Sequence, residues 1–264
     1  MTRQPDPIRA LTAECDELDE LLAGLDDQQW QLPTPAPGWT ITDQVAHLAA
    51  TFKLAGLSPS DPEAFTAVVR RLDPDFSVNV HNAMREFLSD PPEVLFSRWQ
   101  AERAAAVKAL ASVPGDQLVP WLVNPLPPAV LAMAGMMEAF AHGQDITDAL
   151  GIRRARTDRI KFLVAFAVRT WDFGYLAREE PRPDVEFGFE ITAPSGAQWQ
   201  FGPPDAAQRI SGPAEDFCLL VTRRRHRDDL AVTAVGPDAE HWLDIAQAYR
   251  GPAGAGRKPG QFPS

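Results

Sequence analysis

The chain has 264 residues, of which 45% are hydrophobic and 23% are charged, and its formal net charge is −11 at pH 7. This balance is typical of a soluble globular protein with one large domain or two medium ones. An acidic surface repels nucleic-acid phosphates and anionic membranes, so we expect neither as a partner. No apolar run is long enough to cross a bilayer, and the N-terminus lacks the pattern of a signal peptide.

Two cysteines, Cys15 and Cys218, lie far apart in apolar surroundings and have no CxxC spacing. This pattern predicts reduced, buried residues of a cytoplasmic protein. We expect the partner to be a small-molecule substrate and the protein to be a monomer or a homodimer.

The first part of the chain has helical periodicity. Residues 8–25 place leucines and Cys15 at intervals of three and four, which predicts a helix with one core-facing stripe. A proline-rich stretch over 32–38 ends that helix. Thr40 is the expected N-cap of the next helix, with Asp43 three residues later. Further helices are predicted over residues 79–88, 93–112, 129–150 and 158–178. Long helices with mostly short links predict a four-helix bundle.

After Pro181 the pattern changes to short alternating segments. Residues 185–191 and 198–201 flank a turn, which predicts a β-hairpin. Further strands are predicted over 208–212 and 230–235, and helices over 214–224 and 238–249. The tail over 251–264 is rich in glycine and proline and is predicted to be loose. The expected organisation is an all-α bundle over 1–178, a small α+β domain over 184–250, and this tail.

Three residues of the helical part form a candidate metal site. Glu138 and His142 are four residues apart in one predicted helix, so their side chains share a face. His47 lies in the helix that begins near Thr40. Two histidines and a carboxylate from two helices make a three-ligand site with open coordination positions, which is typical of a catalytic metal.

Two other interpretations of these residues stay open from the pattern alone. His47 could be a neutral core histidine, and Glu138 with His142 could be an exposed ion pair. The neighbours of Glu138 are mostly apolar, however, and a divalent cation removes the cost of burying its carboxylate. Zinc suits this ligand set best, although iron or nickel would also accept imidazole and carboxylate.

Two motifs of the chain resemble a known family. Residues 37–48 (PGWTITDQVAHL) and the run EAFAHGQD over 138–145 are similar to the N-terminal domain of mycothiol-dependent maleylpyruvate isomerases, a branch of the DinB-like metalloenzyme superfamily. The resemblance covers roughly residues 5–178 and implies a metal bound by His47, Glu138 and His142. The C-terminal region resembles an uncharacterised actinobacterial subgroup of these proteins, which implies a sterol-carrier-like α+β domain.

Two further residues are candidates for a catalytic role. Asp145 lies three residues after His142 and could accept a hydrogen bond from a ligand histidine, or it could be solvated helix surface. The basic run over 223–227 could be a solvated helix end, or one arginine could bind a substrate carboxylate. The resemblance to the isomerases points to Arg224 for that role, with Arg223 second.

We therefore expect a metal-dependent enzyme that acts on a small organic substrate by thiol- or water-assisted addition, isomerisation or transfer. The resemblance implies mycothiol as a possible co-substrate. The apolar segment over 122–126 favours a hydrophobic substrate, which leaves open a cyclase or lyase of specialised metabolism. A non-enzymatic small-ligand-binding protein that retains the metal site is the remaining alternative.

Overall fold

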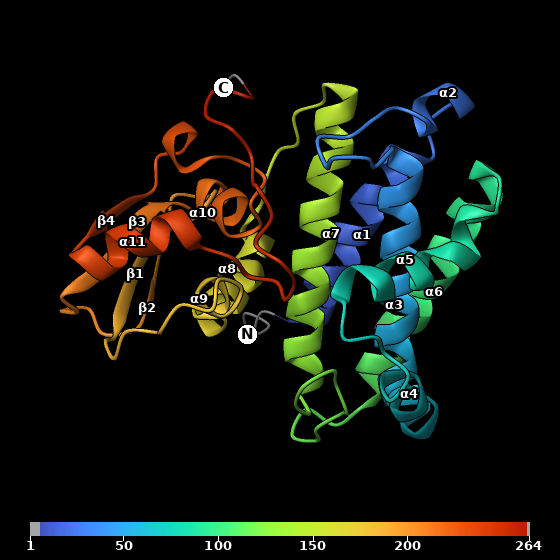
Figure 1. The fold of residues 1–264 in the computed structure, drawn as a ribbon, viewed down its shortest axis with the longest axis horizontal. Helices are drawn as coiled ribbons and strands as arrows, with labels where there is room; N and C mark the ends of the chain where they lie inside the picture. Colours follow the sequence, from blue (N-terminus) through green and yellow to red (C-terminus); the bar gives the residue numbers. More distant parts are fainter. Residues whose placement is uncertain (1–5, 263–264) are drawn as a thin grey trace. The chain divides into compact units, whose positions relative to one another are not determined.

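The computed structural model describes residues 6–262 and divides into two compact units, residues 1–154 and 155–264 (Figure 1). The fold class predicted from the sequence, a helical bundle followed by a small α+β region, is confirmed. Within residues 6–262, no helix combines the length and the apolar character that a membrane span requires.

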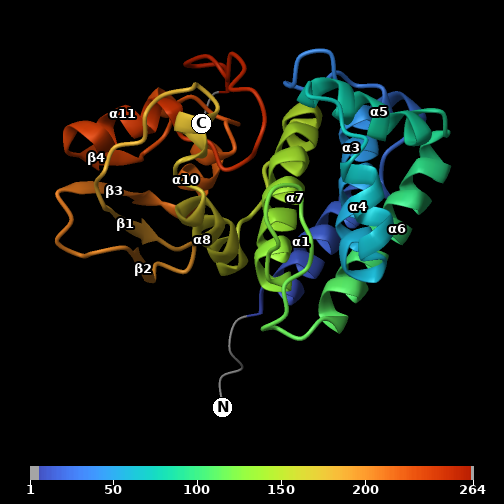
Figure 2. The ribbon, with the colours of Figure 1, turned by 60° about the horizontal axis from the view of Figure 1, so that its bottom comes forward.

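The first unit is built on four long helices that pack against one another. They are α1 (Pro7–Leu22), α3 (Ile41–Ser60), α6 (Pro92–Ser112) and α7 (Pro128–Leu150). Helix α3 packs against α6 and α7, and α1 packs against the same two helices. Figures 1 and 2 show α7 beside α1, and α3 beside α6, in both views. The short helices α2 (Asp27–Trp30), α4 (Pro62–Val69) and α5 (Phe76–Leu88) complete the unit.

Local sequence signals set the bounds of these helices. Thr40 and Asp43 form the expected capping box at the start of α3, in which each side chain bonds the other residue's backbone N–H. Helix α7 ends at Gly151, whose φ of 67° is left-handed and therefore favours glycine. The chain leaves the bundle at this point.

A buried polar cluster joins α1 to α6 in the bundle core. The carboxylate of Asp19 accepts hydrogen bonds from Trp99 Nε1 at 2.7 Å, from Gln100 Nε2 at 3.0 Å and from the guanidinium of Arg103. Because these donors satisfy the carboxylate, Asp19 can be buried at low cost. The cluster fixes which faces of α1 and α6 meet.

The second unit contains a four-stranded sheet with the order β2-β1-β3-β4. Strand β1 (Phe187–Thr192) pairs antiparallel with β2 (Gln198–Phe201), which confirms the predicted hairpin, and parallel with β3 (Gln208–Pro213). Strand β3 pairs antiparallel with β4 (Thr233–Val235).

Two helices, α10 (Ala214–Val221) and α11 (Pro237–Ile245), pack against the sheet. The rings of Phe189, Phe217 and Trp242 lie 5.8–6.0 Å apart between centroids and form the aromatic centre of this unit. Within residues 246–262 the tail has no helix or strand, but the backbone N–H of Gly260 donates to Asp229 at 2.8 Å.

The structure differs from the sequence prediction over residues 158–178. One continuous helix was expected there, but a 3-10 turn (Asp158–Ile160), α8 (Lys161–Arg169) and α9 (Phe173–Leu176) replace it. Gly174 approaches the carbonyl of Ile245 so closely that a Cβ would lie 2.1 Å from its oxygen, and this contact sets the position of α9. Helix α8 packs on α10, so the two units divide at 154/155 and not between residues 178 and 184.

Candidate metal centre

The loop before α3 is fastened by its own hydrogen bonds. The backbone N–H and the hydroxyl of Thr34 both donate to the carbonyl oxygen of Trp39, at 2.8 and 2.9 Å. The capping box then sets the first turn of α3, and His47 follows about two turns from its start. The proline-rich loop and the cap therefore fix the direction in which His47 projects.

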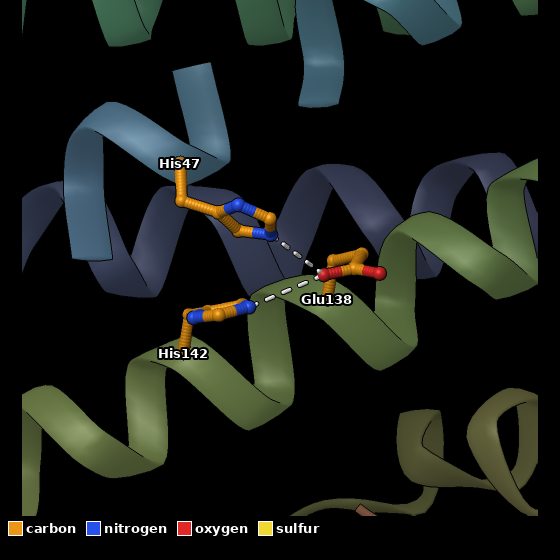
Figure 3. A group of neighbouring side chains, drawn as sticks. All are labelled: His47, Glu138 and His142. Carbon is orange, nitrogen blue, oxygen red and sulfur yellow. Dashed lines mark ion pairs between the residues drawn. The ribbon is translucent and has the colours of Figure 1, made fainter. Parts of the chain in front are cut away.

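Helix α7 supplies the other two side chains of the cluster. Glu138 Oε2 lies 3.4 Å from His47 Nε2 and 3.3 Å from His142 Nε2. One potential ligand atom from each of the three residues lies within 4.8 Å of the others. Figure 3 shows the two imidazoles converging on this carboxylate oxygen from α3 and α7. The structure thus brings together the three residues that the sequence predicted as metal ligands.

The donor set and its spacing fit a divalent metal ion. Two ligand atoms that each lie about 2.0–2.1 Å from a tetrahedral zinc ion are roughly 3.3–3.4 Å apart. The two distances from Glu138 Oε2 have this value, and all three ligand atoms lie within 4.8 Å of one another. The side chains of His47, Glu138 and His142 are 15%, 22% and 12% exposed, which leaves the cluster sheltered and still accessible to a ligand.

The electrostatics of Glu138 show why the cluster favours a cation. Burial raises the pKa of this carboxyl, but hydrogen bonds and charge from His142 and His47 outweigh burial and lower the pKa below its ordinary value. The side chain is therefore an anion that depends on positive charge supplied by its neighbours. A divalent ion bound between the three side chains would supply that charge.

Gln44 is a functional residue that the sequence reasoning missed. Its side chain is fully buried on α3, and its Oε1 lies 2.5 Å from His142 Nδ1. The orientation of the amide follows from a chain of bonds. The Thr34 hydroxyl donates to Trp39, so it accepts from Gln44 Nε2 at 2.8 Å, and Gln44 Oε1 must face the histidine.

This contact favours one tautomer of His142 for metal binding. When Nδ1 donates its proton to Gln44, Nε2 is the nitrogen that would coordinate an ion beside Glu138 and His47. Ligand histidines are commonly held in this way by an acceptor on the other ring nitrogen. The one sequence signal was position, because Gln44 precedes His47 by three residues and so lies on a neighbouring part of the same helix face.

An aromatic ring borders both imidazoles. The Trp39 ring lies 5.4 Å from the His47 ring and 5.9 Å from the His142 ring between centroids, and it is stacked on the latter. The two imidazoles are 4.4 Å apart. Trp39 therefore restricts rotation of both histidines from the side of the loop.

The two candidate catalytic residues outside the cluster have different positions. Asp145 is completely buried on α7, so the interpretation as solvated helix surface is wrong for this residue. Arg224 lies in the second unit after the end of α10, which stops at Val221 and not at residue 224. Its Nη1 donates to the carbonyl of Thr222 at 2.7 Å, and the side chain is half-buried.

These features define a class of protein, a four-helix bundle with a partly buried His-Glu-His cluster suited to a metal ion. The sequence family described as the mycothiol maleylpyruvate isomerase N-terminal domain matches residues 11–147, and the chain belongs to this family. A second family, described as wyosine base formation, matches residues 184–235.

Relatives and solved structures are similar to this chain over most of its length. An uncharacterized protein of Mycobacterium tuberculosis, from the strains CDC 1551 / Oshkosh and ATCC 25618 / H37Rv, is 41% identical over 254 residues, which cover 96% of this chain and 99% of the relative. Crystal structures of a mycothiol-dependent maleylpyruvate isomerase and of a mutant form of it have TM-scores of 0.55 and 0.57. Both are 13% identical and cover 86% of this chain and 91% of the solved one, a likeness that shows the fold.

Proposed function

We propose that the chain is an enzyme that uses a divalent metal ion, held by His47, Glu138 and His142, to transform a small organic substrate. The observation that supports this proposal is the convergence of three ligand atoms from two helices within 4.8 Å of one another, with Glu138 Oε2 3.3–3.4 Å from both histidine nitrogens. The three protein ligands leave at least one coordination position open, as catalytic sites require. Zinc is the ion we expect, with iron and nickel as alternatives.

The surrounding residues would act by holding the ligands in place. Gln44 keeps the proton of His142 on Nδ1, and the Trp39 ring limits rotation of both imidazoles. When bound, the metal would lower the pKa of a thiol or water at the open position or polarise a substrate oxygen. Asp145, buried on the same helix as two of the ligands, is proposed to influence the charge of the site.

The family supports a proposal for the reaction class. Its description names mycothiol and maleylpyruvate isomerase, so we propose a thiol-assisted addition, isomerisation or transfer with mycothiol as co-substrate in the cytoplasm. The apolar segment over 122–126 supports a hydrophobic substrate, and with it the alternative of a cyclase or lyase. A protein that binds a small ligand at the metal without chemistry is the non-enzymatic alternative.

Replacement of the native metal by cobalt tests the thiol proposal directly. Cobalt(II) bound to thiolate sulfur gives a near-ultraviolet charge-transfer band that imidazole and carboxylate do not give. We expect mycothiol to produce this band in the cobalt-loaded protein, and its des-thiol analogue not to produce it. Cobalt loading without a band at saturating mycothiol would exclude thiol activation and leave the water-dependent or binding alternatives.

Arg224 is proposed to bind a carboxylate of the substrate or of the thiol. Loss of a charge-assisted bidentate contact typically weakens affinity about ten- to a hundredfold. Arg224→Ala should have this effect on mycothiol or substrate affinity without a change in metal content, because arginine is not a ligand. Arg182→Ala, an exposed arginine of the same unit, is the control for general loss of charge. Equal, small effects from both substitutions would assign Arg224 a solvated surface role.

A further inference from the structure

A small pocket in the second unit has a strongly basic lining. Its volume is about 120 Å³, and it lies between the basic run after α10, the end of α11 and the tail. Its charged lining consists of four arginines, Arg223, Arg225, Arg227 and Arg257, and one carboxylate, Asp244. This excess of positive charge occurs in a chain with a net charge of −11.

The one carboxylate of the lining is committed to a single arginine. Asp244 Oδ1 lies 2.9 Å from Arg227 Nη1, and Glu240 also pairs with the guanidinium of Arg227. The guanidinium of Arg227 is therefore paired with two carboxylates of α11. Asp244 makes no ion pair with Arg223.

The backbone of Arg223 indicates that its side chain has a specific role. Its φ is 57°, a left-handed conformation directly after the end of α10. Its N–H donates to Leu220 O at 2.9 Å, and the next N–H donates to Leu219 O at 2.8 Å, which is the hydrogen-bond pattern that ends many helices with glycine. An arginine at such a position is strained relative to glycine, so a contribution from its side chain is the expected compensation.

The guanidinium of Arg223 is held by the tail and has unused hydrogen-bonding capacity. Its Nε is buried without a hydrogen-bond partner, and its Nη2 makes one long bond of 3.4 Å to Gly254 O. Gly256 passes so close that a Cβ there would lie 2.7 Å from Nη2. Within residues 6–262, no carboxylate forms an ion pair with Arg223. A buried guanidinium N–H without an acceptor is costly unless a ligand satisfies it.

A second arginine responds to the same local excess of charge. Burial lowers the pKa of Arg178, and the positive charge of Arg223 lowers it further. Arg178 Nη1 donates to two backbone carbonyls, those of Gly174 at 3.0 Å and Ile245 at 3.1 Å. The region around Arg223 therefore has a positive potential that backbone dipoles offset only in part.

We propose that this pocket binds a small oxyanion group, a phosphate or a carboxylate, with Arg223 as the principal contact and Arg225 and Arg257 beside it. Guanidinium groups bind both oxyanions through paired N–H donors. The volume accommodates one such group, with room for several water-sized atoms, and is too small for a nucleic-acid segment. Every lining residue belongs to the second unit, and neither Arg224 nor a proposed metal ligand is among them.

Calorimetric titration of the full chain tests the proposal, with inorganic phosphate and acetate titrated separately at low salt. We expect saturable binding of one of these anions per chain, weakening as sodium chloride is added. Binding of phosphate alone assigns a phosphorylated ligand, and binding of acetate alone assigns a carboxylate. Absence of saturable binding for both anions overturns the proposal.

Two variants separate a binding role from a structural one. Arg223→Gly removes the guanidinium and relieves the left-handed strain, so we expect at least tenfold weaker anion binding with an unchanged or higher Tm. Arg182→Ala, an exposed arginine outside the pocket, should bind the anion as the wild type does. The proposal is contradicted if Arg223→Gly binds the anion with wild-type affinity. It is also contradicted if Arg223→Gly has a lower Tm and neither anion changes the Tm of the wild type.

Discussion

The two charged clusters of this protein have opposite electrostatic designs. In the bundle, one carboxylate oxygen of Glu138 lies between two imidazoles and lacks a permanent positive partner. In the second unit, arginines surround a pocket whose one acid is already paired with Arg227. We therefore propose a cation as the ligand of the first cluster and an anion as the ligand of the second. The comparison teaches that the ligand of a charged cluster depends on which of its charges are already paired within the protein.

Removing a ligand histidine should have the largest effect on the bundle cluster. His142→Ala leaves two of three protein ligands, so we expect the loss of most bound metal. Elemental analysis of purified, untagged protein measures this as metal per chain, and the wild type should hold close to one. His81→Ala, which removes an exposed histidine of α5, should keep the wild-type content. Full occupancy in both His142→Ala and His47→Ala would reject the site.

Replacing the carboxylate with its amide tests whether Glu138 is a ligand or a structural partner. Glu138→Gln keeps the shape but removes the anion, so we expect weaker metal binding with an almost unchanged far-ultraviolet circular dichroism spectrum. The helix should persist because its buried apolar face is intact. If the variant unfolds and the wild-type protein never contains metal, Glu138 is a structural ion-pair partner of the two histidines and not a metal ligand.

The contact between Gln44 and His142 should have a smaller effect on the same property. Gln44→Leu leaves the tautomer of His142 unfixed, and loss of such outer partners typically weakens metal affinity about 10–100-fold. Competition with a chelator measures the affinity, and Gln28→Leu at an exposed position of α2 is the matched control. Equal affinities in the two variants would show that Gln44 only fills space.

The sequence predicted the metal cluster from one local pair, Glu138 with His142, and from the resemblance of two motifs to a known family, which joined His47 to that pair. Glu138 and His142 share one helix, and a capping box predicts the start of the helix that holds His47. Gln44 could not be predicted in the same way. Its role depends on His142, which is 98 residues away, and on a hydrogen-bond chain through a loop threonine.

The second unit was predicted less completely for the same physical reason. The hairpin follows from alternation and a turn, which are local signals. The break between α8 and α9 depends on Gly174 meeting the carbonyl of Ile245, a contact between distant segments. The early end of α10 places Arg223 in a left-handed conformation that the basic run did not reveal. Contacts between distant segments determine both features, and the periodicity of the sequence cannot predict such contacts.

The smallest expected effect concerns the two cysteine thiols of the chain. It tests whether the thiol of the proposed reaction comes from a co-substrate and not from the protein. Cys15 and Cys218 form no disulfide and are buried, as the sequence predicted. Burial raises the pKa of the Cys15 thiol, and the nearby Arg103 offsets only part of this rise. Because the thiolate is the reactive form, we expect no alkylation of native protein by iodoacetamide at pH 8 and complete alkylation in denaturant. Mass spectrometry of intact protein measures the adducts. Rapid modification of Cys15 in the folded state would show that the chain carries its own reactive thiol, and a supplied thiol would no longer be required by the proposed chemistry.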